Sequence, residues 1–326
     1  MIEYDMENSK AWGVKVVFLG TDWESVETLK ALHEDERFDV VGVITVVDKP
    51  VGRKQVLTPS KVKEYALDSG IEVFHTEKNV DRYKKAIDIF KPELIVCKAF
   101  GELIPGFFLE YPKYKSVNVH FSILPKYRGA VPIQKALLEG EQKTGITFML
   151  MSEGLDEGDI LEIYEEPIFS NDTNLSLRER LVKKSATVIG DVLQRWIDGE
   201  ITPKKQDDSK ATYCWQKDIS KENAEIKWSE MEPEYIERLV RAMIPWPVAW
   251  TTVNIQNGNK IMRIFESELI EIHSDNTPGL LYSKNNQLLF STKNPSLSLR
   301  VKDLQVEGKA RIKEKDFLNG LGRELL

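Results

Sequence analysis

A polar pair that could do acid–base chemistry lies in one apolar segment of the chain. Asn118 and His120 are two residues apart in Val117–His120, so both side chains face the same way if this segment is a strand. The amide could stabilise an oxyanion while the imidazole moves a proton. The alternative is a buried histidine with satisfied hydrogen bonds. The neighbouring amide, the strand end and the Pro- and Gly-rich stretch up to Pro132 favour a functional pair.

A second segment, Glu153–Asp159, holds four carboxylates and two glycines within seven residues. A carboxylate from this segment could orient His120 and raise the pKa of its imidazole. We choose Asp156, because glycines on either side allow the backbone to come close to a site. A hairpin turn and a loose cation site are the alternatives. Full EF-hand spacing is absent, which argues against calcium.

The elements around these residues alternate between strand and helix patterns. Such alternation, with continuous apolar strands, predicts a parallel sheet covered on both faces. Ligands bind such sheets beyond the carboxyl ends of the strands, here at residues 99–101 and 118–125. The predicted strands are 14–19, 38–47, 71–74, 94–97, 117–120 and 147–151, the predicted helices are 26–33, 60–69, 80–90 and 132–139, and 48–59 is a predicted loop.

The second half of the chain has a different pattern. A long helix is predicted from Asn174 to about Asp198, and a polar stretch at 204–212 resembles a linker. Short strand patterns with turn residues between them follow and predict a small antiparallel barrel. The predicted domains are therefore 1–203 and 213–326, and the short strands are 249–255, 260–269, 279–283, 287–292 and 297–306.

Charge and composition exclude several classes of protein. The net charge of −7 and the pI of about 5.4 argue against a general nucleic-acid binder. Residues 293–326 carry eight basic and five acidic side chains, which fits either a nucleic-acid contact or a solvated surface. Cys97 and Cys214 lie outside any CxxC or Cys/His cluster, so reduced thiols are expected. Because there is neither an apolar span nor a signal-peptide pattern, we expect a cytoplasmic protein without a membrane partner.

A series of motifs makes the chain resemble the methionyl-tRNA formyltransferase family over nearly its whole length. The central block, Asn118–His120 with Ser122–Gly129, resembles enzymes that transfer formyl from 10-formyltetrahydrofolate. The second half resembles the tRNA enzymes, whereas glycinamide ribonucleotide enzymes would be shorter. The remaining motifs are Phe18–Thr21, Asp48–Arg53, Leu57–Ser60, Ala99–Pro105, Thr144–Thr147, Gly154–Asp159, Ser209–Tyr213, Ile226–Trp228, Pro245–Pro247, Leu304–Arg311 and Asp316–Leu318.

This resemblance implies a fold and a set of site residues. The fold would be α/β, with a Rossmann-like parallel-sheet formyltransferase domain followed by an OB-like β-barrel domain that contacts tRNA. Asn118, His120 and Asp156 would be the catalytic residues, with Asp156 favouring a charged His120 that helps Asn118 to stabilise the oxyanion. Arg53 would contact the tRNA acceptor end; the alternative is a solvated residue on a mobile loop. The residues lining the folate site would be Ser122, Ile123, Leu124 and Pro125.

The function implied is formylation of initiator methionyl-tRNA by a monomer in a bacterial cytoplasm, with 10-formyltetrahydrofolate as cosubstrate and no metal. The runner-up is a sugar-nucleotide N-formyltransferase that uses the same donor. A dinucleotide-dependent oxidoreductase is disfavoured, because no GxGxxG follows the first strand. A non-enzymatic RNA-binding protein would need a broken catalytic trio, and all three residues are present. Arg128 could pair with a phosphate or with a carboxylate that anchors the turn.

Overall fold

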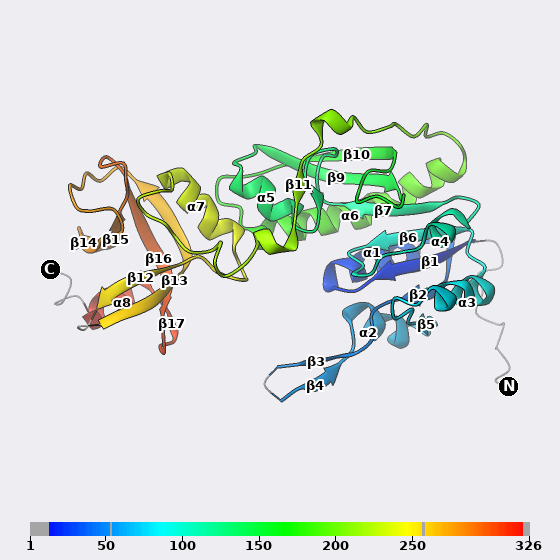
Figure 1. The fold of residues 1–326 in the computed structure, drawn as a ribbon, viewed down its shortest axis with the longest axis horizontal. Helices are drawn as coiled ribbons and strands as arrows, with labels where there is room; N and C mark the ends of the chain where they lie inside the picture. The colour runs from blue at the N-terminus through cyan, green and yellow to red at the C-terminus, as the bar shows by residue number, and fades with distance from the viewer. Residues whose placement is uncertain (1–12, 53, 256–257, 322–326) are drawn as a thin grey trace. The chain divides into compact units, whose positions relative to one another are not determined.

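The computed structural model describes residues 13–52, 54–255 and 258–321, which form two compact units (Figure 1). The first unit contains the described residues of Met1–Arg128 together with Gly145–Glu166 and Glu179–Thr212. The second contains Gly129–Thr144, Pro167–Arg178 and the described residues of Tyr213–Leu326. Each unit thus gathers segments that are far apart in the sequence. The domain boundaries at 203 and 213 stay a prediction.

A seven-stranded sheet forms the centre of the first unit (Figure 1), in the order β10-β9-β7-β6-β1-β2-β5. The predicted parallel pairing is confirmed for the five strands from β7 to β5. The next strand, β9, runs antiparallel to β7. The strands are β1 (Val14–Gly20), β2 (Phe38–Ile44), β5 (Val73–Phe74), β6 (Leu94–Lys98), β7 (Ser116–His120), β9 (Lys143–Leu150) and β10 (Ile160–Pro167).

The antiparallel direction of β9 corrects the expectation of a uniformly parallel sheet. A parallel crossover needs a helix that packs back onto its own sheet. The helix between β7 and β9 is α5 (Pro132–Leu138), which groups with the second unit. Alternation of strand and helix patterns does not reveal which body a helix joins, so the sequence did not predict this direction.

Helices of the first unit begin where polar caps are available. Ser60 accepts a hydrogen bond from the Lys63 amide at the start of α2, and Asn79 caps α3 in the same way. Aromatic and aliphatic side chains from α3, α4 and the strands make one buried cluster that includes Leu19, Phe90 and Phe108. The helices are α1 (Trp23–Glu34), α2 (Lys61–Asp68), α3 (Val80–Phe90), α4 (Gly106–Glu110) and α6 (Asn174–Ile197), the last of which begins in the second unit.

Short elements account for most differences from the sequence analysis. The predicted loop 48–59 contains an antiparallel hairpin of β3 (Lys49–Val51) and β4 (Val56–Thr58). Its apolar residues are exposed, so they give no core-facing pattern. Strand β10 was not predicted either, because it carries acidic residues along a partly exposed edge. The two-residue strands β8 (Arg128–Gly129) and β11 (Tyr213–Cys214) pair with each other.

The second unit contains the predicted small antiparallel β-domain, which is confirmed with one additional strand. Trp228 stacks on Phe290 with ring centroids 4.5 Å apart and donates to Thr251 Oγ1 at 2.8 Å, so this tryptophan belongs to the core. The elements are β12 (Trp250–Ile255), β13 (Gly258–Ile270), β14 (Leu281–Lys284), β15 (Gln287–Ser291), β16 (Ser298–Val306), β17 (Arg311–Lys313), α7 (Pro233–Ala242) and α8 (Glu314–Leu321).

Among the described residues, no helix is both long enough and apolar enough to span a lipid bilayer.

Close packing between β2 and α3 gives a prediction about stability. A Cβ on Gly42 would overlap the ring of Phe90, so Gly42→Val should lower the free energy of unfolding by roughly 1–3 kcal/mol. The measurement is urea denaturation followed by circular dichroism. Gly101→Ala is the control, because a Cβ there meets no atom within 4 Å. Equal losses in both variants would contradict this packing.

Candidate active site

The structure brings Asn118, His120 and Asp156 together at the carboxyl end of β7. Asn118 and His120 point from the same side of the strand, and Asp156 comes from the loop between β9 and β10. Asn118 Nδ2 donates to Asp156 Oδ1 at 3.2 Å, and His120 Nδ1 lies 3.5 Å from Asp156 Oδ2. Side-chain exposure is 6% for His120 and 13% for Asp156, so their interaction is shielded from water. Their catalytic roles stay a prediction.

The hydrogen bonds of His120 define which nitrogen can accept a proton. His120 Nε2 lies 2.9 Å from the carbonyl oxygen of Tyr127. Because a carbonyl only accepts, Nε2 must carry a hydrogen. In the neutral ring, Nδ1 is therefore the basic nitrogen, and it faces Asp156. When Nδ1 takes up a proton, both N–H groups of the imidazolium face an acceptor.

Burial sets the resting charge of His120. Removal from water lowers the pKa of the imidazole below its ordinary value of 6.5, and this effect outweighs the opposite influences of Asp156 and the Tyr127 carbonyl. The positive charge of Lys98 lowers it further. Asp156 thus favours the charged ring, but burial is the larger influence and favours the neutral imidazole. A neutral imidazole is suited to accept a proton.

The predicted folate segment, Ser122–Pro125, lies in the turn between β7 and β8. Thr147 Oγ1 donates to the Ser122 carbonyl at 2.6 Å and accepts from the Leu124 amide at 3.2 Å. Ser122 and Leu124 are buried, while Ile123 and Pro125 are partly exposed. Any ligand on this turn would therefore meet Ile123, Pro125 and backbone groups, and a folate contact stays a prediction.

The backbone of the Asp156 loop is held in an uncommon conformation. Asp156 has a φ of 51°, in the left-handed region that costs a non-glycine residue roughly 1–2 kcal/mol. A Cβ on Gly158 would overlap the Leu150 carbonyl oxygen, so the loop requires glycine there. Tyr127 and Ala99, in the two adjoining loops, also have positive φ values of 60° and 49°. Strained residues of this kind concentrate at functional sites.

Gln206 and Arg128 support this loop from behind. Gln206 Nε2 donates to the carbonyls of Asp156 and Gly158, at 2.9 and 2.8 Å. The fully buried Arg128 donates to Gln206 Oε1 and, at 2.7 Å, to Asp208 Oδ1. Arg128 therefore anchors a turn through a carboxylate, one of its two predicted roles. The sequence analysis missed Gln206, because a glutamine in a polar stretch carries no pattern of its own.

Arg53 lies outside the described residues, so its predicted contact with tRNA is untested. No group of three or more His, Cys, Asp or Glu side chains in the described part of the chain could hold a metal ion. Cys97 and Cys214, both within the described residues, are buried and form no disulfide bond with each other.

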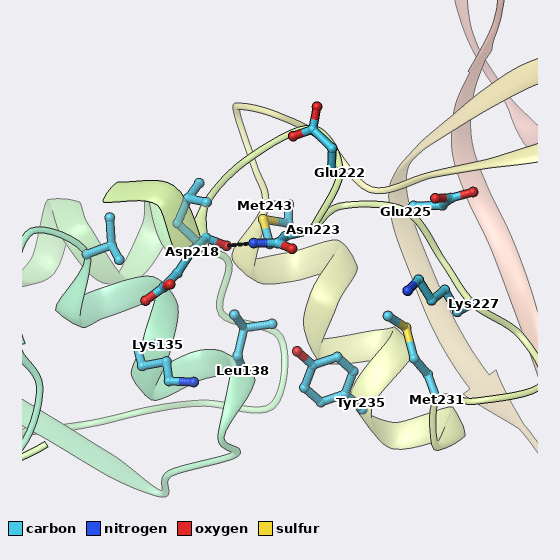
Figure 2. A pocket seen from close by; sticks show the side chains of 12 residues that line it. Lys135, Leu138, Asp218, Glu222, Asn223, Glu225, Lys227, Met231, Tyr235 and Met243 are labelled. Atoms are coloured by element: carbon cyan, nitrogen blue, oxygen red, sulfur yellow. Dashed lines mark hydrogen bonds between the residues drawn. The ribbon is translucent and has the colours of Figure 1, made fainter. Parts of the chain in front are cut away.

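A separate cavity of about 280 Å³ lies within the second unit. Figure 2 shows Lys135, Lys227 and Tyr235 pointing into the same space, with Glu222 turned away from it. Lys135 Nζ pairs with Glu139 at 2.7 Å. None of the predicted site residues lines this cavity, and its mixture of ammonium and carboxylate groups does not select one ligand chemistry.

The geometry predicts the titration of His120. We expect its imidazole to titrate below pH 6.5 and to titrate lower still in Asp156→Asn, because that change removes the carboxylate that favours the imidazolium. NMR titration of the Cε1 protons measures both values, and His120→Gln assigns the signal among the four histidines. A midpoint above 6.5 in the unchanged protein, or a rise in Asp156→Asn, would contradict this geometry.

Comparison with solved structures places the chain in a known fold. An N-formyltransferase from Helicobacter canadensis, solved with folinic acid and dTDP-3-aminofucose, matches with a TM-score of 0.65 at 21% identity, covering 88% of this chain and 98% of that one. HypX from Aquifex aeolicus, solved with tetrahydrofolic acid, matches with a TM-score of 0.59 at 16% identity, covering 94% of this chain and 47% of that one. At these identities the likeness concerns the fold alone.

Sequence comparison is more specific. Residues 14–193 match the formyl transferase family model, and residues 218–322 match the model of the formyl transferase C-terminal domain. The methionyl-tRNA formyltransferase of Halalkalibacterium halodurans is 41% identical over 96% of both chains. That of Bacillus licheniformis is 39% identical over 94% of this chain and 95% of its own. With this identity along nearly its whole length, the chain belongs to the methionyl-tRNA formyltransferase family of enzymes.

Proposed function

We propose that this chain transfers the formyl group of 10-formyltetrahydrofolate to the α-amino group of methionine on initiator tRNA. The product is N-formylmethionyl-tRNA, which starts translation. The observation that carries the proposal is the contact among Asn118, the buried His120 and the partly buried Asp156, in which Nδ1 of a neutral imidazole points towards a carboxylate. The chain's membership of the family supports initiator tRNA over an amino-sugar nucleotide, whose enzymes are more distant relatives.

The residues beside this site fit a folate. The start of α4, which follows the loop after β6, contacts the Asp156 loop, because a Cβ on Gly106 would overlap the carboxylate of Glu153. Leu103 and Leu155, one from each loop, are 93% and 45% exposed. Exposed apolar side chains next to a polar, buried centre suit a flat aromatic ring system with a reactive group at its edge. We propose that these loops and the Ser122–Pro125 turn bind the formyl donor.

The chain's own groups can carry the proton and the charge. As the amine nitrogen bonds to the formyl carbon, the nitrogen must lose a proton, and Nδ1 of the neutral His120 accepts it. Asp156 and the Tyr127 carbonyl then stabilise the imidazolium. One hydrogen of Asn118 Nδ2 bonds to Asp156, and the second can stabilise negative charge on the formyl oxygen. His120 finally returns the proton to the departing nitrogen of the donor, so the ring is neutral again.

The proposal includes a monomer acting in the bacterial cytoplasm, where initiator tRNA is charged and used. The named relatives are bacterial proteins, which supports this location. We further propose that the antiparallel β-domain of the second unit contacts the body of the tRNA, as folds of this kind often bind nucleic acid.

The test is transfer of labelled formyl from 10-formyltetrahydrofolate to methionyl initiator tRNA, with an amino-sugar nucleotide as a parallel acceptor. We expect formylated tRNA alone. Asn118→Ala, His120→Ala and Asp156→Ala should each reduce the rate by about a hundredfold or more, because each removes a group that handles the proton or the charge. Circular dichroism of each variant checks the fold. Formylated sugar alone would reject the acceptor, and near-normal turnover by His120→Ala would reject the mechanism.

Arg53 provides a separate test of the acceptor side. Arg53→Ala should weaken the use of tRNA, because it removes a cation proposed to pair with phosphate near the acceptor end, and it should leave folate affinity unchanged. Steady-state kinetics at several tRNA concentrations, with folate binding by fluorescence, measure the two effects. Lys54→Ala, which removes the adjacent positive charge, is the matched control. Unchanged tRNA kinetics in Arg53→Ala would reject the tRNA contact and favour the alternative of a solvated residue.

A further inference from the structure

Lys98 is a buried cation that the mechanism above does not use. It is the last residue of β6 and only 4% exposed. Its backbone is held on both sides, because it is the register partner of Gly20 on β1 and its carbonyl accepts from Ser25 Oγ at 2.6 Å. A lysine in such a position is unusual, since burial of an ammonium group is costly unless it has partners.

The partners of Lys98 lie on either side of His120 in the chain. Lys98 Nζ donates to the carbonyl of Val119 at 3.2 Å and lies 3.1 Å from the centroid of the Phe121 ring. The first contact holds the peptide group that precedes His120, and the second is a cation–π contact with the residue that follows it. Lys98 therefore contacts the end of β7 through the two residues that flank His120.

Strand geometry puts Lys98 behind the catalytic pair. Cys97 is the register partner of Asn118, so these two side chains share a face of the sheet. Lys98, the next residue, leaves β6 on the opposite face, where Val119 and Phe121 also point. His120 thus has the carboxylate of Asp156 in front of it and the ammonium of Lys98 behind it.

We propose that Lys98 is a positioning residue for formyl transfer, whose ammonium group fixes the end of β7 behind His120 and keeps the imidazole in its proton-accepting form. The proposal rests on the proposed function above. Among the residues that the structure describes, two charged groups act on His120: Asp156, from the loop between β9 and β10, and Lys98, from β6. The Cys97 thiol, also on β6, stays neutral, because burial raises its pKa to about 12. Lys98 therefore counteracts Asp156, which by itself would favour an imidazolium unable to accept a proton.

The first test is the NMR titration of His120 in Lys98→Met, which keeps the length of the side chain and removes its charge. We expect the midpoint of His120 to rise, because the positive charge that lowers it is removed. Lys98→Arg, which retains the charge, should bring the midpoint back towards that of the unchanged protein. Lys184→Met is the matched control, because Lys184 also donates to a backbone carbonyl, that of Glu165 at 2.6 Å. If Lys98→Met does not fold, Lys98→Gln gives the same test and keeps a donor for Val119.

The second test is the pH dependence of formyl transfer. In Lys98→Met the acid limb of kcat should move to higher pH by the same amount as the NMR midpoint, with little change in KM for the folate. A purely structural role would lower activity at all pH values without moving the limb. An unmoved His120 midpoint, or an equal shift in Lys184→Met, would overturn the proposal. The NMR titration needs no turnover. It therefore tests the effect of Lys98 on His120 even if the unchanged protein fails to formylate tRNA.

Discussion

Burial of the His120–Asp156 pair is the constraint on which the rest of the site depends. In water, the charge of the imidazole would depend little on the carboxylate, because the solvent would screen their interaction. In the interior, each polar atom needs a hydrogen-bond or charge partner. The structure provides such a partner for both imidazole nitrogens and both carboxylate oxygens. The Tyr127 carbonyl occupies one imidazole nitrogen, and Asn118 occupies one carboxylate oxygen. The remaining nitrogen is left as the basic one, facing the carboxylate.

Maintaining that arrangement requires rigid loops. Three non-glycine residues with positive φ, Ala99, Tyr127 and Asp156, lie in the three loops that converge on the site. Such conformations persist only when the surroundings hold them. Here Thr147 holds the turn after β7 by a hydrogen bond. Gln206, which accepts from the buried Arg128, holds the Asp156 loop in the same way. The polar stretch at 204–212 is thus part of the support for the site.

Charge in the second unit is largely compensated within the unit itself. Arg311 and Lys313 both pair with Asp303, at 2.8 and 2.9 Å. Arg300 pairs with Glu314 in the same way. Within the described residues 293–321, these basic side chains therefore form an ion-paired sheet surface more than a free phosphate-binding one. Arginine and lysine held by carboxylates release few counterions on binding nucleic acid, so the salt dependence contributed by this surface should be modest.

The sequence by itself determined the elements and the chemical groups. Apolar strands alternating with capped helices were sufficient to predict the five parallel strands, and two-residue spacing was sufficient to place Asn118 beside His120, because these are local patterns. The tertiary structure alone decided the direction of β9, the support of Asp156 by Gln206, and the position of Lys98 behind His120. It also decided the resting charge of the imidazole. These features depend on packing between segments far apart in the chain and on the loss of water around them. A local sequence pattern predicts neither of these effects.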